Sequence, residues 1–211
     1  MDNRDKLSTL ARQIQICKKC PLYKEATKAV PGEGSSEAKI VFIGEGPGFY
    51  EDVQGKPFVG NAGKYLDFLL TKVGLKRDEV FITNVVKHRP PENRDPATAE
   101  VIACSAWLEQ QLAIISPKII VTLGRWSLAR YAPRAKISDV HGKLFRTQGV
   151  AVLPMYHPAA ALRSGQTQKQ LEEDFLKNSD LFSNPEKTEE LTKNTLENGQ
   201  VSLPEGQGSL F

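Results

Sequence analysis

The chemistry that this sequence could support begins with its thiols. Cys17 and Cys20 form a C-x-x-C pair in the segment CKKC, and thiolates at this spacing hold zinc, hold an iron–sulfur cluster or form a redox pair. The pair follows a helical segment instead of opening a helix after a strand, which disfavours a thioredoxin-type redox motif. A closed metal site needs two more ligands, and Cys104 and His88 are the candidates.

Three kinds of metal site stay open at this point. Imidazole ligates iron in some clusters, so an iron–sulfur cluster held by the three cysteines and His88 is one option. The others are a three-thiolate cluster with an open corner, and a zinc ion held by the three cysteines and His88. An odd number of cysteines that includes a C-x-x-C pair also argues against a disulfide framework.

A second group of candidates lies in three short motifs that are far apart in the chain. They are GEGPG at 44–48 with PFVG at 57–60, TNVVKHRPPENRDP at 83–96, and YHPAAALR at 156–163. Each motif adjoins an apolar run. An open α/β sheet has its binding crevice outside the carboxyl ends of its strands, so we expect the three motifs to meet there.

Two residues in these motifs stand out by type. Asn84 interrupts a β-branched run, where asparagine is unfavourable, and its amide can donate and accept hydrogen bonds at once. His157 follows an apolar run and can donate to a developing anion without being charged. The glycine-rich loop at 44–48 could hold a phosphate, but it lacks the P-loop lysine and its proline breaks the dinucleotide fingerprint.

The elements that must position these motifs alternate along the chain. Apolar periodicity predicts helices over 2–16, 61–75, 96–115 and 167–181, with Asp95 as the cap of the third. Short β-branched runs predict strands over 39–43, 80–86, 118–123 and 150–154. This alternation predicts an α/β fold with three layers, in which a central, mostly parallel four-stranded sheet lies between helices.

Composition limits the partners and the location. The 211 residues are 40% hydrophobic, which suits one domain with a real core. The net charge is +3, of which residues 181–211 carry −3, so residues 1–180 carry +6, a balance that suits a polyanionic partner. No apolar run reaches the ~18 residues of a membrane span, and the first residues do not form a secretory signal. We therefore expect a cytoplasmic protein that does not contact a membrane.

Together, the CKKC pair and the three motifs resemble the iron–sulfur, family 4 uracil-DNA glycosylases over about residues 7–175. The resemblance implies the uracil-DNA glycosylase-like fold and hydrolysis of the N-glycosidic bond of uracil in DNA, which leaves an abasic site for base excision repair. It also implies a 4Fe–4S cluster. The family has a fourth cysteine where this chain has His88, and zinc stays the alternative.

The resemblance further implies a role for each pocket residue. Glu45, Gly46 and Gly48 would line the uracil pocket, and Gly46 stands where the best-known glycosylase family has an aspartate. Phe58 would stack on the flipped base, since an aromatic face suits any base. Asn84 would read the O4 and N3–H pair of uracil and reject cytosine.

The remaining implied roles concern the leaving base and the DNA. Glu51 would lie near uracil C5 and exclude thymine or organise water, and Asn93 would support the pocket, for instance by bonding Glu45. His157 would hydrogen-bond uracil O2 and stabilise the departing anion. The DNA candidates are Leu162 as a minor-groove wedge and, for phosphates, Arg163, Arg89, Arg94, Lys64, Lys87 and Arg125.

Alternatives stay open beside this interpretation. A glycosylase with a different range of deaminated bases is one, and a non-catalytic, metal-stabilised DNA-binding module is the other. The combination of Phe58, Asn84 and His157 argues against the second. The expected partner is uracil-containing DNA, single- or double-stranded, bound by a monomer that is associated with the nucleoid.

The chain changes character near residue 182. Residues 182–211 are polar and rich in Glu, Lys, Asn and Thr, so we expect a disordered acidic tail after a glycosylase domain at 1–181. The tail contains QGSLF, which resembles the Q-L-[SD]-L-F peptides that bind bacterial sliding clamps. Gln207, Leu210 and Phe211 would make the contacts, while Gly208 replaces the leucine of the motif.

Overall fold

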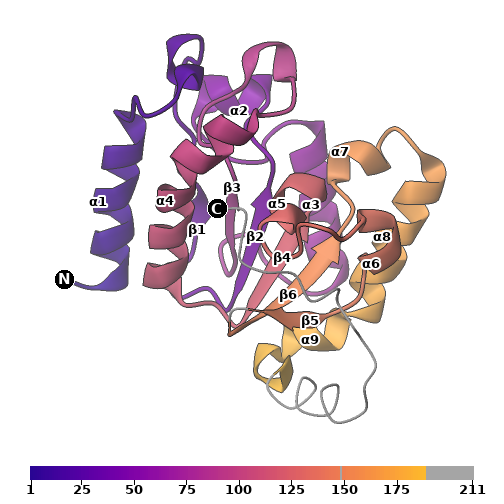
Figure 1. Cartoon of the computed structure of the whole chain (residues 1–211). Helices are drawn as coiled ribbons and strands as arrows, with labels where there is room; N and C mark the ends of the chain where they lie inside the picture. The colour runs from indigo at the N-terminus through magenta and orange to yellow at the C-terminus, as the bar shows by residue number, and fades with distance from the viewer. Residues whose placement is uncertain (148, 189–211) are drawn as a thin grey trace.

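A mixed sheet between two layers of helices makes up the fold in the computed structural model, which describes residues 1–147 and 149–188 (Figure 1). Over these residues the sheet has six strands in the order β1-β3-β2-β4-β6-β5. The four predicted strands are confirmed as the parallel centre: β3 (Phe81–Asn84), β2 (Ile40–Gly44), β4 (Ile119–Leu123) and β6 (Val150–Met155).

Two short edge strands were not predicted. They are β1 (Glu33–Gly34) and β5 (Phe145–Thr147), which pair antiparallel with β3 and β6 respectively. Strands of two and three residues are too short to produce a hydrophobic period. The sheet is therefore wider than expected, but its four central strands are parallel, as predicted.

The long helices match the predicted ones with small shifts. They are α1 (Asn3–Gln15), α3 (Asn61–Lys72), α4 (Thr98–Ile115) and α8 (Gly165–Lys177). The prediction that Asp95 caps α4 was wrong, because the helix begins at Thr98 and Glu100 accepts a hydrogen bond from the Ala97 amide. Asn178 separates α8 from a further short helix, α9 (Ser179–Ser183).

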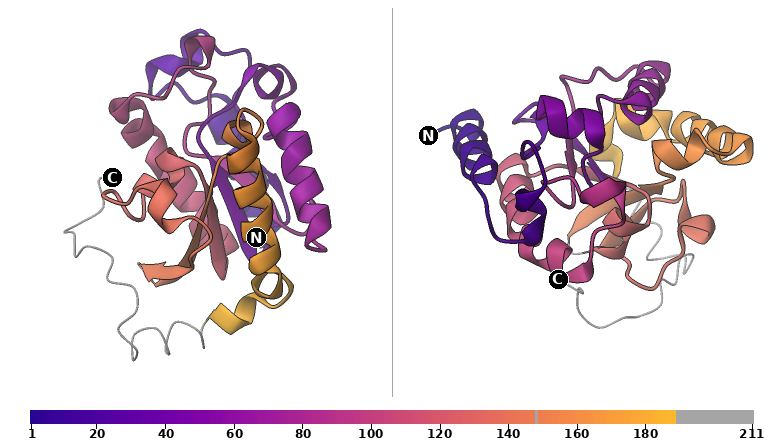
Figure 2. Two further views of the ribbon diagram at one scale, coloured as in Figure 1. Left: turned by 90° about the vertical axis from the view of Figure 1, so that its right-hand side faces the viewer. Right: turned by 90° about the horizontal axis from the view of Figure 1, so that it is seen from above.

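Two hydrophobic clusters hold the layers together, one on each face of the sheet. Side chains alternate along a strand, so β2 sends Val41 and Ile43 into one cluster and Ile40 and Phe42 into the other. Helices α1 and α4 cover the first face, with α1 on the outer side of α4, and α3 and α8 cover the second (Figure 2). Because β2 is buried on both sides, its sequence is a continuous apolar run.

The folded body extends past the boundary predicted at residue 181. Phe182 is buried in the second cluster, with ring centroids 5.5 Å from Phe175 and 6.4 Å from Phe42. A short 3₁₀ turn, η3 (Pro185–Lys187), follows, and Thr188 is buried. The prediction of a disordered tail from 182 was wrong for 182–188. Phe182 packs into the core, which the polar composition of the surrounding residues did not indicate. Residues 189–211, with the clamp-like motif, lie outside the described residues.

The short helices that follow the central strands frame one end of the sheet. Helix α2 (Phe49–Gln54) follows β2, α5 (Arg125–Ala129) follows β4, and α7 (Pro158–Ala161) follows β6, and all three lie toward the upper ends of the strands in Figure 1. The turn η2 (Pro91–Asn93) lies in the segment after β3. In residues 1–147 and 149–188, none of the helices has the length and apolar character of a membrane span.

Candidate active site

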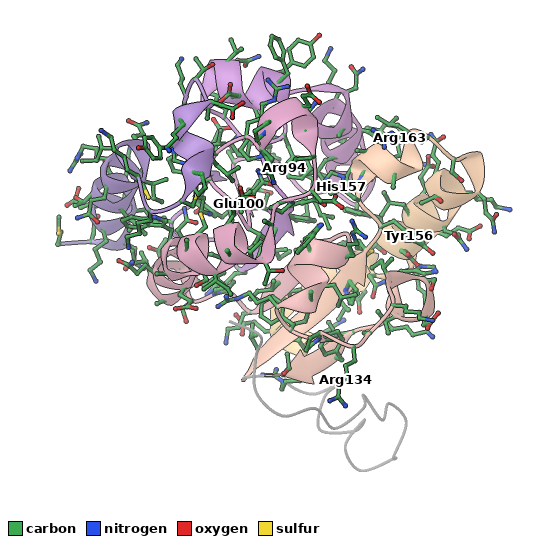
Figure 3. The ribbon with its side chains drawn as sticks, turned by 45° about the horizontal axis from the view of Figure 1, so that its top comes forward. Arg94, Glu100, Arg134, Tyr156, His157 and Arg163 are labelled. Carbon is green, nitrogen blue, oxygen red and sulfur yellow. The ribbon has the colours of Figure 1, made fainter. Side chains whose placement is uncertain are left out.

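A pocket of about 400 Å³ opens at the carboxyl ends of the central strands. Its lining includes every residue that the sequence analysis assigned to catalysis or base binding: Glu45, Gly46, Gly48, Glu51, Phe58, Asn84, Asn93 and His157. Arg94 and Arg163 also line it, and Figure 3 shows His157 between them. The three motifs therefore meet as the topology requires, while the roles of their side chains stay predictions.

The glycine that ends β2 lets two pocket side chains approach each other. A Cβ built on Gly44 would lie 2.6 Å from Cζ of Phe58 and would also collide with the Asn84 amide. Phe58 has a φ of +50°, a strained conformation for a bulky residue, and its ring centroid lies 5.6 Å from that of His157. The strained backbone places this ring in the pocket wall, and its role in stacking on a base stays a prediction.

Glu51 explains how that strained conformation is held. Its Oε1 accepts hydrogen bonds from the amides of Val59 and Gly60, each at 2.8 Å. These amides immediately follow Phe58, so the carboxylate fastens the loop that presents the ring. Glu51 thus has a positioning contact as well as a place in the pocket wall.

Asn84, which lines the pocket, has a buried acceptor without a hydrogen-bond partner among the described residues. The residue is buried at the end of β3, and among the described residues its Oδ1 has no hydrogen-bond partner. Leaving a buried acceptor unpaired costs about 1–3 kcal/mol. Because Asn84 lines the pocket, a ligand N–H group would satisfy this atom.

The hydrogen bonding of His157 determines where its proton lies. Its Nδ1 accepts a hydrogen bond from the Ala159 amide at 3.1 Å, which leaves the proton of a neutral ring on Nε2. Burial lowers the pKa of His157 to about 4; Arg163 acts in the same direction and Glu51 opposes it. At neutral pH the ring is therefore an uncharged donor.

Glu45 lies close to Asp95, a pocket-lining carboxylate that the sequence analysis did not assign to the pocket. The pKa of Glu45 is raised to about 7, mainly by burial and then by the charge of Asp95, which also hydrogen-bonds it, while Arg125 acts in the opposite direction. Asp95 in turn forms an ion pair with Arg125. The Oδ1 of Asn93 accepts from Nε of Arg89 at 2.7 Å, and a bond between Asn93 and Glu45 stays a prediction.

This carboxyl pair predicts a pH dependence. Asp95→Asn removes the charge that raises the pKa of Glu45, so the pKa should fall and the Glu45 carboxylate should form at a lower pH. A single-turnover pH–rate profile should show an inflection near pH 7 for the native protein that moves to lower pH in Asp95→Asn. Superimposable profiles would refute the coupling. Asp67→Asn, which alters a carboxylate paired with Arg77 instead, is the matched control.

Comparison with known proteins settles the family. Residues 31–179 match the family model described as the uracil DNA glycosylase superfamily. The chain belongs to this superfamily. It is 47% identical to the type-4 uracil-DNA glycosylase of Sulfurisphaera tokodaii, over 87% of this chain and 88% of that protein.

Further relatives place the chain within the superfamily. It is 47% identical to the type-4 uracil-DNA glycosylase of Saccharolobus solfataricus, over 85% of this chain and 88% of that protein. It is 43% identical to that of Archaeoglobus fulgidus, over 87% of this chain and 97% of that protein. The chain is thus a member of the type-4 group, as its motifs predicted.

Lys87, which was predicted to contact a DNA phosphate, is buried inside the protein. It is only 1% exposed, so the prediction of a phosphate contact was wrong. Its Nζ donates to Thr83 Oγ1 at 2.7 Å, to the carbonyl of Asn84 at 2.8 Å and to Gln111 Oε1 at 2.7 Å. Burial lowers its pKa to about 8. Lys87 therefore ties the end of β3, and with it Asn84, to helix α4.

Of the residues predicted to contact DNA, two arginines are hydrogen-bonded to other side chains of the protein, whereas Leu162 is exposed. Arg94 is held by Glu100 through two hydrogen bonds of 2.9 and 2.7 Å, and Arg89 is held by Asn93. Leu162, next to the pocket-lining Arg163, is exposed, as a wedge must be. Both arginines are thus held by side chains of this protein, and their contacts with DNA phosphates stay predictions.

Three of the four predicted metal ligands gather between the end of α1 and helix α4. Cys17 and Cys20 pack against the core cluster that contains Cys104. The pKa of Cys104 is raised to about 11, mainly by burial; Lys87 opposes this shift, while the nearby Cys20 and Cys17 contribute to it. The Sγ of Cys17 accepts a hydrogen bond from Trp107 Nε1 at 3.1 Å.

His88, the fourth candidate, has a different neighbour. It is buried, and desolvation lowers its pKa, while the carboxylate of Asp52 on α2 raises it. Within residues 1–147 and 149–188, no group of three or more His, Cys, Asp or Glu side chains converges as the ligands of one metal ion would. The three thiols therefore lie near enough to affect the pKa of Cys104 without forming a converged ligand set, and the ligand roles of the cysteines and of His88 stay predictions.

Proposed function

We propose that this protein is a uracil-DNA glycosylase, which hydrolyses the N-glycosidic bond of uracil in DNA, releases free uracil and leaves an abasic site. The observation that carries the proposal is the unpaired, buried Oδ1 of Asn84 in a pocket that also holds Phe58 and His157. The N3–H group of uracil is a donor of the kind that this atom lacks. Cytosine has an acceptor at N3, which would leave both atoms unpaired.

The chemistry follows from where charge develops. The uracil must leave the base stack and enter the pocket, where Phe58 would stack on it and Asn84 would read its edge. As the glycosidic bond breaks, negative charge grows on the base, and the Nε2–H of His157 would donate to uracil O2. A neutral imidazole is sufficient for this task, because its remaining N–H group donates a hydrogen bond without the ring being charged.

The two pocket glutamates would then divide their work. Glu51 is engaged by two backbone amides and would position Phe58. Glu45, with a pKa of about 7, is the carboxyl group whose proton can change near neutral pH. We assign Glu45 to the water that attacks the sugar, with Asn93 supporting the pocket through Arg89.

Incubation with a uracil-containing oligonucleotide, followed by alkali, tests the function. Strand cleavage at the uracil position is expected in single- and double-stranded DNA, and not at thymine or cytosine. Cleavage at hypoxanthine alone would favour the rival of a different base range. Binding without cleavage of any strand would favour a non-catalytic DNA-binding module.

We also propose that Cys17, Cys20, Cys104 and His88 hold a 4Fe–4S cluster. The donor set fits such a group, because crowded thiols gain from a cationic metal core and each iron of a cluster takes a separate ligand. The N–H of Trp107 donates to one of the sulfurs, as outer hydrogen bonds to metal ligands do. The cluster would serve as a structural link between the end of α1 and helix α4.

Purified protein should test this cofactor directly. It should be brown, absorb at about 400 nm and contain about four iron atoms per chain. Cys17→Ala should lose the colour and lower the melting temperature. His88→Cys should keep it, while His88→Ala should lose iron if the imidazole is a ligand. A colourless protein with one zinc per chain would rule out the cluster.

We further propose that Gln207, Leu210 and Phe211 bind a bacterial sliding clamp. The support is the likeness of QGSLF to clamp-binding peptides. Tethering would raise the local concentration of the enzyme on replicated DNA. On this proposal the protein acts as a cytoplasmic monomer at the nucleoid.

Deleting residues 207–211 should abolish clamp binding and leave excision from short oligonucleotides unchanged. The affinity of the native motif should be about 1 μM, because the free-energy cost of ordering a peptide when it binds offsets part of its contact energy. Gly208→Leu restores the missing apolar contact and should tighten binding. Equal affinities of native, truncated and Gly208→Leu proteins in a clamp titration would contradict the proposal.

A further inference from the structure

Two aromatic side chains lie exposed on the first turn of α2, directly beside the pocket. Phe49 is 53% exposed and Tyr50 is 58% exposed, and their ring centroids are 5.5 Å apart at an angle of 81°. We call this pair the aromatic shelf. Removing two large apolar rings from water is favourable, so a ligand that covers them would gain binding free energy.

Neighbouring residues make the aromatic shelf continuous with the pocket. Gly48 and Glu51, on either side of the pair in the sequence, both line the pocket. Tyr50 also packs close to the loop that holds the stacking ring, since its Cδ2 would lie 3.4 Å from a Cβ built on Gly60. A ligand that enters the pocket therefore passes within reach of the shelf.

A positive charge backs the aromatic shelf. The guanidinium carbon of Arg89 lies 5.2 Å from the ring centroid of Phe49, and its Nε donates to Asn93 in the pocket wall. Aromatic faces combined with a nearby arginine form the usual platform for unpaired nucleobases, because the rings stack on the base and the cation attracts the backbone.

We propose that the aromatic shelf is a second DNA subsite, which stacks an unpaired base next to the uracil on the same strand. This inference rests on the proposed function, because it takes the strand in the pocket to be DNA. A base in a fully paired duplex stays in its own stack and cannot reach the shelf. The enzyme should therefore bind uracil in single-stranded or locally opened DNA more tightly than in a perfect duplex.

The test compares the native protein with Phe49→Ala/Tyr50→Ala in enzyme titrations under single-turnover conditions. The double variant should bind a single-stranded uracil oligonucleotide about tenfold more weakly, the scale of losing one stacked base. Its rate at saturating enzyme should stay close to native. Duplex affinity should change much less.

Removing the base instead of the shelf supplies the decisive comparison. Oligonucleotides with an abasic analogue on either side of the uracil keep the backbone but lack the stacking partner. One of the two should weaken binding by the native protein about tenfold and have no further effect on the double variant, because the two changes remove the same contact. Independent, additive effects would overturn the proposal.

Two single variants complete the design. Phe68→Ala is the matched control, since Phe68 is also an exposed aromatic, at 47%, with Lys72 over its ring, but it lies on α3 beside Tyr65. It should bind DNA like the native protein. Tyr50→Phe keeps the aromatic face and should retain DNA affinity. A loss of affinity in this variant would show that stacking on the ring is not what binds the DNA.

The outcomes separate this inference from the proposed function. If native protein excises uracil but the double variant binds all substrates normally, the aromatic shelf is not a DNA subsite and the function stands. If no strand is cleaved, binding of a uracil-free single strand still shows whether the shelf stacks a base. Equal binding by native and variant protein there would overturn it.

Discussion

Replacing His157 with alanine should lower the rate of uracil excision by about 10²–10³-fold, the cost of losing one donor to a developing anion. The ring is an uncharged donor because its Nδ1 accepts from Ala159 and burial lowers its pKa to about 4. Its contact strengthens only as the base departs, so DNA affinity should change little. Single-turnover rates and equilibrium binding measured on one oligonucleotide separate the two effects.

His141→Ala provides the control for this prediction. His141 is also a partly buried histidine, but its Nδ1 pairs with Asp174 at 2.7 Å and it stands outside the pocket lining. That variant should keep a near-native excision rate. An equal loss in both variants would point to general destabilisation, and a near-native rate for His157→Ala would show that the assigned role is wrong.

Changing Asn84 to aspartate should alter which base the pocket accepts. Burial raises the pKa of a carboxyl group, so the new side chain would be protonated and could donate to N3 of cytosine while it accepts from N4. We expect release of cytosine to appear and release of uracil to fall by at least about 10²-fold, because a mismatched hydrogen-bonding edge is rejected strongly. Alkali cleavage of oligonucleotides that carry each base measures both rates.

Asn93→Asp is the matched control for this change. Asn93 also lines the pocket, but its Oδ1 is already occupied by Arg89. It should not gain release of cytosine. If Asn84→Asp keeps native uracil release and releases no cytosine, Asn84 does not read the base.

Elements with a strong local signal could be predicted from the sequence. The run that forms β2 is apolar throughout because both faces of that strand are buried, and α1 has a clear helical period with Asp2 as its cap. The strand ends in turn predicted where the pocket would be, since parallel strands place their carboxyl ends at one edge. The edge strands β1 and β5 escaped because two or three residues carry no period.

The amino-acid sequence by itself determined the alternation of strands and helices, the family and the residue types that the pocket would contain. Those properties depend on residue patterns within short stretches of the chain and on motifs that are each contiguous in the sequence. Only the tertiary structure decided which side chains became partners across long separations. The pairing of Asp95 with Glu45 and Arg125, the hydrogen bond from Lys87 to Gln111 and the packing of Phe182 against Phe42 depend on how the layers pack. Packing free energy is shared among residues that no local pattern connects.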